Sequence, residues 1–482
     1  MKPLTRILIL FLVMGVAMLF RRVNDALRML PAPELPHDQW WGEGDAPKDW
    51  SKYVARTSSV MASERVTMYP QSTIDDLRQE LNRSLHLPPP LEGVAFEYGF
   101  NSDYLKELIV YWRDDYLPRW SEREEFLSQF NHFNTEIQGL RMHFIHLKVG
   151  EDPKDRKPHY PLLLLHGWPG SVREFYSLIR KLHGIQTDKK TNTNNEYIFD
   201  VIIPSLPGFG WSQSASKPGL GCAEIAVIMR NLMLRLGYEQ FFVQGGDWGS
   251  LIGSHMATLF PQNVLGYHSN MCTAMSLRSQ LKGAFAALFP SLFAPKGFES
   301  LFFPLSKKWQ YLLEESGYFH LQATKPDTIG NALTGNPVGL AAYILEKFST
   351  WTNSEYRQLA DGGLRKRFEL DALLDNLMVY YVTNSITTSQ RLYAESYSSR
   401  ERALALERVQ TDVPTGCVRF KHDALHSLDF QLRDKYRNLM HSTYYNEGGH
   451  FAALETPELL YPDFIAFVKK VEKQLKLKYK NE

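Results

Sequence analysis

The segment GGDWG at residues 245–249 constrains the fold of this chain more than any other, because it places a carboxylate in a glycine-flanked turn. Residues 240–244 ahead of it are mostly apolar and predict a short strand, whereas residues 250–256 behind it predict a helix. Small residues at such a junction permit the strained turn of a nucleophile elbow, which exposes one side chain. A carboxylate there suits displacement at an sp3 carbon, followed by hydrolysis of the ester. The alternative interpretation is a glycine-rich turn with an incidental Asp.

Two further junctions lie upstream of the elbow. Residues 161–171 and 200–210 each read as a buried strand that ends in a loop. In an α/β-hydrolase fold, one oxyanion-hole donor is the backbone N–H after the nucleophile, and another comes from a strand-to-loop junction upstream. We therefore predict that the backbone N–H groups of Trp168 and Trp248 stabilise negative charge on the Asp247 carbonyl. Three junctions in this order predict an α/β-hydrolase core.

A base and its acid partner are expected downstream. His450 follows a Gly-Gly loop near the C-terminus, and its ordinary pKa near neutrality suits a water-activating base. The chain order of this fold is nucleophile, acid, histidine, so the acid should follow the strand expected at residues 413–420. Asp423 is the first carboxylate after that strand and is our choice. Asp412 and Glu447 are the less favoured candidates.

Several motifs together resemble one family, the microsomal epoxide hydrolases. The resemblance covers nearly the whole chain, including the hydrophobic N-terminal segment. Within that family, PTGCVRFKHD at residues 414–423 is most similar to the insect juvenile hormone epoxide hydrolases. The other motifs are HGWPGS at 166–171, GGDWGS at 245–250, ESGYFHLQATKPD at 315–327 and GGHFAALE at 448–455.

The resemblance implies a role for each matching residue. Asp247 matches the nucleophile, His450 the water-activating base and Asp423 the acid partner. Tyr318 and Tyr393 match the two cap tyrosines that donate to the epoxide oxygen, a role that suits phenols because an alkoxide is a poor leaving group. Mammalian members commonly carry Glu at the acid position, so the shorter Asp423 departs from their pattern. We expect this departure to alter how the histidine is held and how fast the ester is hydrolysed, without changing the roles.

The implied reaction converts a lipophilic epoxide and water to a diol through a covalent ester on Asp247. We expect no metal and no organic cofactor, because the sequence has no convincing Cys/His metal pattern, P-loop or dinucleotide fingerprint. Juvenile hormone is the first choice of substrate, and broad detoxification of xenobiotic epoxides is the second. The competing hypotheses are a haloalkane dehalogenase, which would not need the two phenols, and a non-catalytic binder of hydrophobic ligands.

Composition excludes some partners. The net charge is +1, from 54 basic and 53 acidic side chains, so nothing suggests a nucleic acid. No required protein partner is evident. Three cysteines, Cys222, Cys272 and Cys417, argue against a disulfide framework in so long a chain and are compatible with a reducing compartment.

The chain is expected to have five parts, among them a helical cap inserted between the halves of the hydrolase core and, from the resemblance, an N-terminal region that wraps the catalytic domain. The cap can shut bulk solvent away from the site. The expected ranges are 1–22 for a membrane anchor, 23–155 for the wrapping region, 156–272 for the first core part, 273–405 for the cap and 406–482 for the second core part.

The N-terminus predicts contact with membrane lipid. Residues 7–20 are an uncharged run flanked by Arg6 and by Arg21 and Arg22. This run is shorter than the roughly 20 residues usual for a spanning helix and also fits the core of a cleaved signal peptide. The paired arginines disfavour cleavage, so we expect a single uncleaved anchor in the endoplasmic reticulum membrane. The excess of positive charge after the run favours a cytosolic catalytic domain.

Overall fold

The computed structural model describes residues 18, 20–49, 68–83, 85–149, 157–183 and 196–479. Most of the expected membrane anchor, residues 1–17 and 19, lies outside the described residues. Within the described ranges, no helix is both long and apolar enough to cross a membrane.

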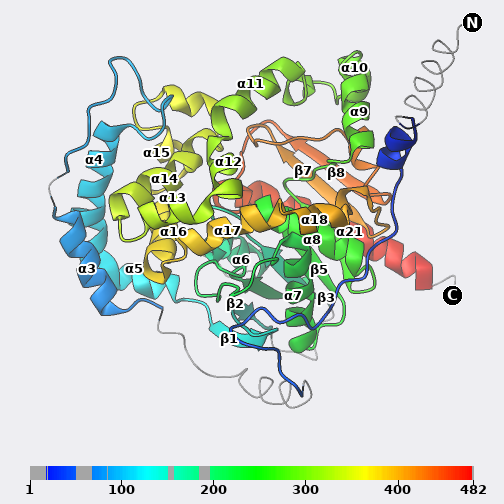
Figure 1. Cartoon of the computed structure of the whole chain (residues 1–482), viewed down its shortest axis with the longest axis horizontal. Helices are drawn as coiled ribbons and strands as arrows, with labels where there is room; N and C mark the ends of the chain where they lie inside the picture. Colours follow the sequence, from blue (N-terminus) through cyan, green and yellow to red (C-terminus); the bar gives the residue numbers. More distant parts are fainter. Residues whose placement is uncertain are drawn as a thin grey trace, which may run out of the picture.

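A mixed sheet of eight strands forms the centre of the described chain (Figure 1). Its order is β1-β2-β4-β3-β5-β6-β7-β8, in which β1, β2 and β4 pair antiparallel and the remaining neighbours pair parallel. Helices cover the parallel strands, so these strands read as continuous apolar runs. The strands are β1 His132–Ile137, β2 Leu140–Leu147, β3 His159–Leu165, β4 Ile198–Pro204, β5 Phe241–Gly245, β6 Val264–Ser269, β7 Thr415–Phe420 and β8 Leu439–Tyr445.

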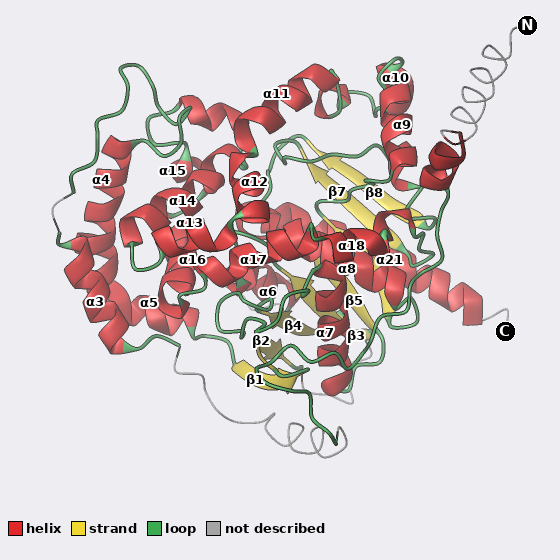
Figure 2. Cartoon of the chain, viewed as in Figure 1, coloured by secondary structure: helices red, strands yellow, loops and turns green. Residues whose placement is uncertain are grey.

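Helices pack against the sheet in two groups (Figure 2). Helix α7 packs on α8, and α8 contacts β3, β5 and β6, whereas α21 contacts α6, β6, β7 and β8. This arrangement confirms the predicted α/β-hydrolase core. The helices are α6 Tyr176–Leu182, α7 Cys222–Arg235, α8 Asp247–Leu259, α19 Asp429–Leu432, α20 Ala452–Glu455 and α21 Pro457–Tyr479.

A helical insertion separates β6 from β7, as the sequence predicts, although its exact boundaries stay a prediction. We call this insertion the cap. Its helices are α9 Leu277–Ala286, α10 Pro290–Phe293, α11 Leu305–Glu315, α12 Gly317–Thr324, α13 Pro326–Leu333, α14 Pro337–Thr350, α15 Leu364–Arg367, α16 Leu370–Thr383, α17 Ile386–Ser396 and α18 Ser399–Leu404.

The N-terminal region packs beside the cap, at the left of Figure 1. Helix α4 is continued by a π-helical turn at Trp112–Tyr116 and a 3₁₀ turn at Leu117–Arg119, so the chain stays helical into α5. The region contains α3 Gln71–Leu81, α4 Ser102–Tyr111 and α5 Trp120–Leu127.

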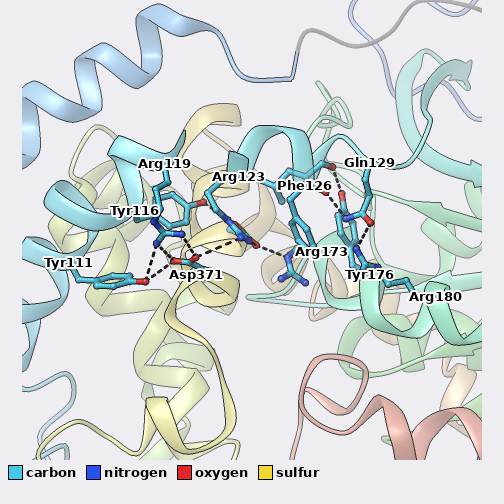
Figure 3. Close-up of polar contacts among 12 residues, drawn as sticks. Tyr111, Tyr116, Arg119, Arg123, Phe126, Gln129, Arg173, Tyr176, Arg180 and Asp371 are labelled. Atoms are coloured by element: carbon cyan, nitrogen blue, oxygen red, sulfur yellow. Dashed lines mark hydrogen bonds and ion pairs between the residues drawn. The ribbon is translucent and has the colours of Figure 1, made fainter. Parts of the chain in front are cut away.

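A buried charge network joins the N-terminal region, the cap and the core. Asp375 of α16 is fully buried and accepts hydrogen bonds from the Tyr116 hydroxyl at 3.0 Å, Arg123 Nη2 at 2.5 Å and Arg173 Nε at 2.9 Å. One turn earlier, Asp371 accepts from Arg119 and Tyr111. Figure 3 shows these arginines directed toward α16 from separate segments. One helix of the cap therefore binds both neighbouring parts of the molecule.

We predict that Asp375→Asn lowers the free energy of unfolding by about 3–5 kcal/mol, because it leaves the buried Arg173 and the partly buried Arg123 without their shared carboxylate. Denaturant unfolding measures this change. The matched control is Asp327→Asn, which breaks an exposed pair with Arg391 and should cost no more than about 1 kcal/mol. Equal losses in the two variants would contradict a locking role for Asp375.

Cys272 and Cys417 form a disulfide, contrary to the expectation from composition. Cys272 follows β6 and Cys417 lies in β7, so the bond joins neighbouring strands at the base of the cap. The two cysteines are 145 residues apart in sequence, and only the pairing of their strands brings them together. Composition cannot reveal that pairing. Cys222 is free and buried.

Candidate active site

Asp247 lies at the tip of a tight turn between β5 and α8. Its φ is 49°, in the left-handed region that residues other than glycine rarely adopt. The turn has no room for side chains on either side. A Cβ at Gly245 would lie 2.5 Å from the Gly249 carbonyl carbon, and a Cβ at Gly249 would lie 2.1 Å from the Leu165 oxygen. The glycines of the predicted elbow therefore let the strand and the helix meet closely enough to expose Asp247.

The loop after β3 contacts the Asp247 carboxylate. The Trp168 N–H donates to Asp247 Oδ1 at 2.8 Å. A Cβ at Gly167 would lie 2.2 Å from the same oxygen, so the loop approaches at a position that only glycine permits. The second predicted donor, the Trp248 N–H, is in the first turn of α8, and within the described chain it makes no hydrogen bond to this carboxylate.

His450 lies between two carboxylates. Its Nε2 is 3.3 Å from Asp247 Oδ2, and its Nδ1 is 2.8 Å from Asp423 Oδ1. The His450 backbone N–H donates to the Trp351 carbonyl at 3.0 Å, and the Trp351 ring packs edge-on against the imidazole. The structure thus brings together the predicted nucleophile, base and acid, from three separate strand ends.

The two less favoured acids lie elsewhere. Asp412 pairs with Arg437, and Glu447 pairs with Arg367 at 3.0 Å. Neither carboxylate has an interaction with His450 among the described contacts. Asp423 is 5% exposed and reaches the imidazole despite its short side chain, because the loop after β7 turns back toward the histidine loop.

The two carboxylates set the charge of His450. Burial by itself would lower the pKa of His450, but the negative charge of Asp423 and the hydrogen bond to Asp247 together raise that pKa well above its usual value. This environment therefore favours the protonated form of the imidazole. Its ability to accept a proton depends on losing the negative charge of a neighbour.

Tyr318 and Tyr393 come from α12 and α17 of the cap, and their rings lie 6.0 Å apart at the nucleophile side of the cap. The Tyr318 ring stacks on Trp168 at 5.4 Å, and the Tyr393 ring meets Trp248 edge-on at 4.6 Å. Each tyrosine thus packs on the residue that carries a predicted oxyanion donor. Burial, with a contribution from the Asp247 charge, raises the pKa of each phenol well above the usual value for tyrosine. Both side chains therefore stay protonated and can donate hydrogen bonds.

A small cavity beside the nucleophile contains a glutamate that the sequence analysis missed. The cavity has a volume of about 20 Å³, room for about one water molecule, and Asp247, His450 and Glu174 are among its lining residues. Burial, together with the Asp247 charge, raises the pKa of Glu174 to about 8. Its sequence signal is weak, since Ser171-x-x-Glu174 also reads as a helix-capping pattern.

A second missed glutamate holds the histidine loop. Glu455 accepts the backbone N–H groups of Gly449 at 2.9 Å and Phe451 at 2.8 Å, which flank His450. Burial raises its pKa to about 8. Glu455 is the last residue of the motif GGHFAALE, but its contact with the two backbone N–H groups is visible only in the folded chain.

One cluster in the described chain has the residue types of a metal site. These residues are His268 of β6, His441 of β8 and Asp463 of α21, and both histidine Nε2 atoms hydrogen bond to Asp463 Oδ1, at 2.9 Å and 3.1 Å. These bonds and a hydrogen bond from Thr443 account for the cluster as packing. The expectation of no metal and no cofactor stays a prediction.

The fold and the site together define a hydrolase with a carboxylate at the nucleophile elbow. Residues 63–175 match the family described as epoxide hydrolase N terminus, and residues 160–406 match the alpha/beta hydrolase fold. The chain belongs to the epoxide hydrolase family, and its reaction is the hydrolysis of an epoxide.

Relatives with nearly full coverage support this assignment. Juvenile hormone epoxide hydrolase 2 of Ctenocephalides felis is 47% identical, covering 98% of this chain and 96% of the relative. Epoxide hydrolase 1 of Oryctolagus cuniculus is 45% identical, covering 91% and 93%. The crystal structure of juvenile hormone epoxide hydrolase from Bombyx mori is 44% identical with a TM-score of 0.84, covering 91% of this chain and 100% of that one.

We predict that Asp247→Asn lowers the pKa of His450, because the substitution removes a negative charge next to Nε2 and leaves burial unopposed on that side. NMR titration of the imidazole measures this shift, and mass spectrometry verifies that the new amide is intact. The exposed His37 of the N-terminal region is the internal reference. An unchanged His450 pKa would show that Asp247 does not control the charge of the base.

Proposed function

We propose that Asp247 opens the epoxide by forming a covalent ester, and that water activated by His450 then releases the diol. The observation that carries this proposal is the position of the Asp247 carboxylate, which lies 2.8 Å from the Trp168 N–H and 3.3 Å from His450 Nε2. One carboxylate thus touches both an oxyanion donor and a base.

In the first step Asp247 Oδ2 attacks one epoxide carbon and the carbon–oxygen bond of the ring breaks. Tyr318 and Tyr393 donate hydrogen bonds to the leaving oxygen, and one of the two phenols gives it a proton as the ring opens. The protonated His450 then returns a proton to that phenolate and becomes neutral. Asp247 Oδ1 becomes the ester carbonyl oxygen and keeps its hydrogen bond from Trp168. The support for the tyrosines is their position on the cap, packed on the two tryptophans of the oxyanion loops.

In the second step His450 removes a proton from water, which attacks the Asp247 carbonyl carbon. Ester formation has by then removed the Asp247 charge that raised the pKa of His450, so the imidazole can reach its neutral, basic form. Asp423 holds Nδ1 at 2.8 Å. The cavity beside Glu174 is the site for this water, and the N–H groups of Trp168 and Trp248 receive the oxyanion.

The proposed substrate is a lipophilic epoxide, first of all juvenile hormone. Relatives named for that hormone match over more than nine tenths of this chain, at 45% and 47% identity. Broad xenobiotic detoxification is the second candidate, because a relative named epoxide hydrolase 1 is 45% identical over 91% of the chain. Both substrates need the same chemistry and differ in the fit of the pocket.

The proposed location is the endoplasmic reticulum membrane, through an uncleaved N-terminal anchor with the catalytic domain on the cytosolic side. The uncharged run at residues 7–20 and the arginines after it support this location. The disulfide is more typical of an oxidising compartment, but Cys272 and Cys417 are both buried and shielded from cellular thiols. Two measurements test the anchor. An inserted anchor should keep the protein in the membrane during alkaline carbonate extraction, and an uncleaved one should leave an intact mass that includes Met1.

We predict that one turnover of a juvenile-hormone-type epoxide in water enriched with heavy oxygen labels the Asp247 carboxylate. Hydrolysis of the ester at its carbonyl carbon transfers a water oxygen to the aspartate, and mass spectrometry of the peptide that contains Asp247 detects it. Asp247→Ala should form neither the label nor the diol.

Further outcomes of this experiment separate the competing mechanisms and substrate classes. Diol without label in Asp247 would rule out the covalent ester and indicate direct attack by water. Activity on simple aromatic epoxides alone would reassign the substrate to the xenobiotic class.

We predict that Tyr318→Phe and Tyr393→Phe each slow ester formation by about 10²-fold, because each removes one donor to the developing alkoxide. Rapid-quench measurement of the ester gives the rate directly. Tyr343→Phe is the matched control, since its ring also contacts Trp168 but its hydroxyl donates to Gln322 at 3.0 Å. A loss in the control equal to the losses in the other two would indicate disturbed packing.

A further inference from the structure

Helices α9 and α10 and the turn between them carry large apolar side chains that face solvent. These side chains recur at intervals of three and four residues along this stretch, and we call them the α9 stripe. Leu288 is 70% exposed and Leu292 is 74% exposed, although both lie in the folded cap. The stripe consists of Leu277, Leu281, Phe285, Leu288 and Leu292.

Helix α11 repeats this pattern. Leu305, Trp309 and Leu313 are spaced by four residues, and Trp309 and Leu313 are 65% and 81% exposed. No residue of α11 is fully buried. Arg357 contacts Glu314 at 2.6 Å and Glu315 at 3.3 Å, so ion pairs fix this helix to the rest of the cap. The apolar side of α11 is therefore held outward by polar contacts.

We call the two stripes together the outer cap face. It is defined by these eight exposed apolar residues, and exposed Lys296 and Lys307 lie next to them in the chain. Arg278 and Lys282, which interrupt the α9 stripe in sequence, pair with Asp434 at 3.3 Å and 2.6 Å. An apolar face with lysines at its margin has the composition of a surface that lies in the headgroup region of a bilayer.

The first described helical residues lie near the same part of the molecule. In Figure 1 helices α9, α10 and α11 form the upper edge, and the helical residues 20–27, in dark blue, lie to the right of α9. Met18 and Phe20, at the end of the uncharged run 7–20, are both exposed. The uncharged run 7–20, which we propose as the membrane anchor, leads in the sequence directly into these described helical residues.

We infer that the outer cap face docks on the lipid bilayer that holds the N-terminal segment, with Trp309 and the leucines of both stripes among the lipid headgroups. The catalytic domain then has a second contact with the membrane besides its N-terminus. Its orientation is fixed, with the cap toward the lipid and the sheet away from it.

This orientation has a consequence for the substrate, which rests on the proposed function. Helix α12, which carries Tyr318, directly follows α11. A lipophilic epoxide dissolved in the bilayer would therefore meet the cap at α11, the helix next to the one that carries Tyr318. We expect the membrane itself to concentrate the substrate at the cap.

Trp309 provides the test, because it is the exposed tryptophan among the described residues. The full chain is reconstituted in vesicles of phosphatidylcholine with some phosphatidylserine, and its fluorescence is compared with that in vesicles whose acyl chains are brominated. We expect brominated lipid to quench the wild type and most of this quenching to disappear in Trp309→Phe. Equal quenching of the two proteins would overturn the inference, and the result does not depend on catalysis.

Substitutions in the stripe give an independent test. Leu288→Glu/Leu292→Glu should raise KM for an epoxide dissolved in the vesicles and leave kcat/KM for a small water-soluble epoxide unchanged. The control is Leu91→Glu, at a similarly exposed leucine of the N-terminal region. The double variant could instead leave KM for the vesicle-dissolved epoxide unchanged and convert a dimer to a monomer in sedimentation. In that case the face binds a second copy of the chain and the inference is wrong. If neither epoxide is hydrolysed by the wild type or by any variant, the result would count against the proposed function instead.

Discussion

The close approach of the elbow to the end of β3 determines the geometry of the whole site. Gly249 lies against the Leu165 carbonyl, and Gly167 lies against the Asp247 carboxylate, at distances that exclude any side chain. This packing holds Asp247 at a positive φ, which costs a residue other than glycine about 1–3 kcal/mol. The hydrogen bond from Trp168 follows from the same contact. Without it, the proposed nucleophile and its proposed oxyanion donor would not meet.

Electrostatic control of His450 couples the two steps of the proposed reaction. The imidazole is buried between Asp247 and Asp423, and their charges raise its pKa. The contribution of this charged histidine to stability is present below its unfolded pKa of about 6.5 and is lost as pH rises through its higher folded pKa. A covalent ester on Asp247 removes one of the two charges. The base would thus become available when its water is needed.

The cap owes its position to contacts from other parts of the chain. Asp375 binds Arg123 of the N-terminal region and Arg173 of the core, and the disulfide closes the base of the insertion. The positions of Tyr318 and Tyr393 depend on this placement. Both residues come from cap helices that are far from Asp247 in the sequence, so only the packing of the cap brings them near Asp247. The apolar side chains of the outer cap face stay exposed to solvent, and we infer that a membrane covers them.

The local patterns of the sequence determined the elbow, the strand-to-loop junctions and the order of nucleophile, acid and histidine, because glycine spacing and apolar runs act over a few residues. They also predicted α8, although that helix begins at Asp247 and includes the nucleophile itself. Only the tertiary structure decided which distant groups meet. It paired Cys272 with Cys417, placed Glu174 beside the nucleophile and turned the apolar stripes of α9 and α11 outward. Such contacts arise from the packing of elements up to hundreds of residues apart, and no local pattern encodes them.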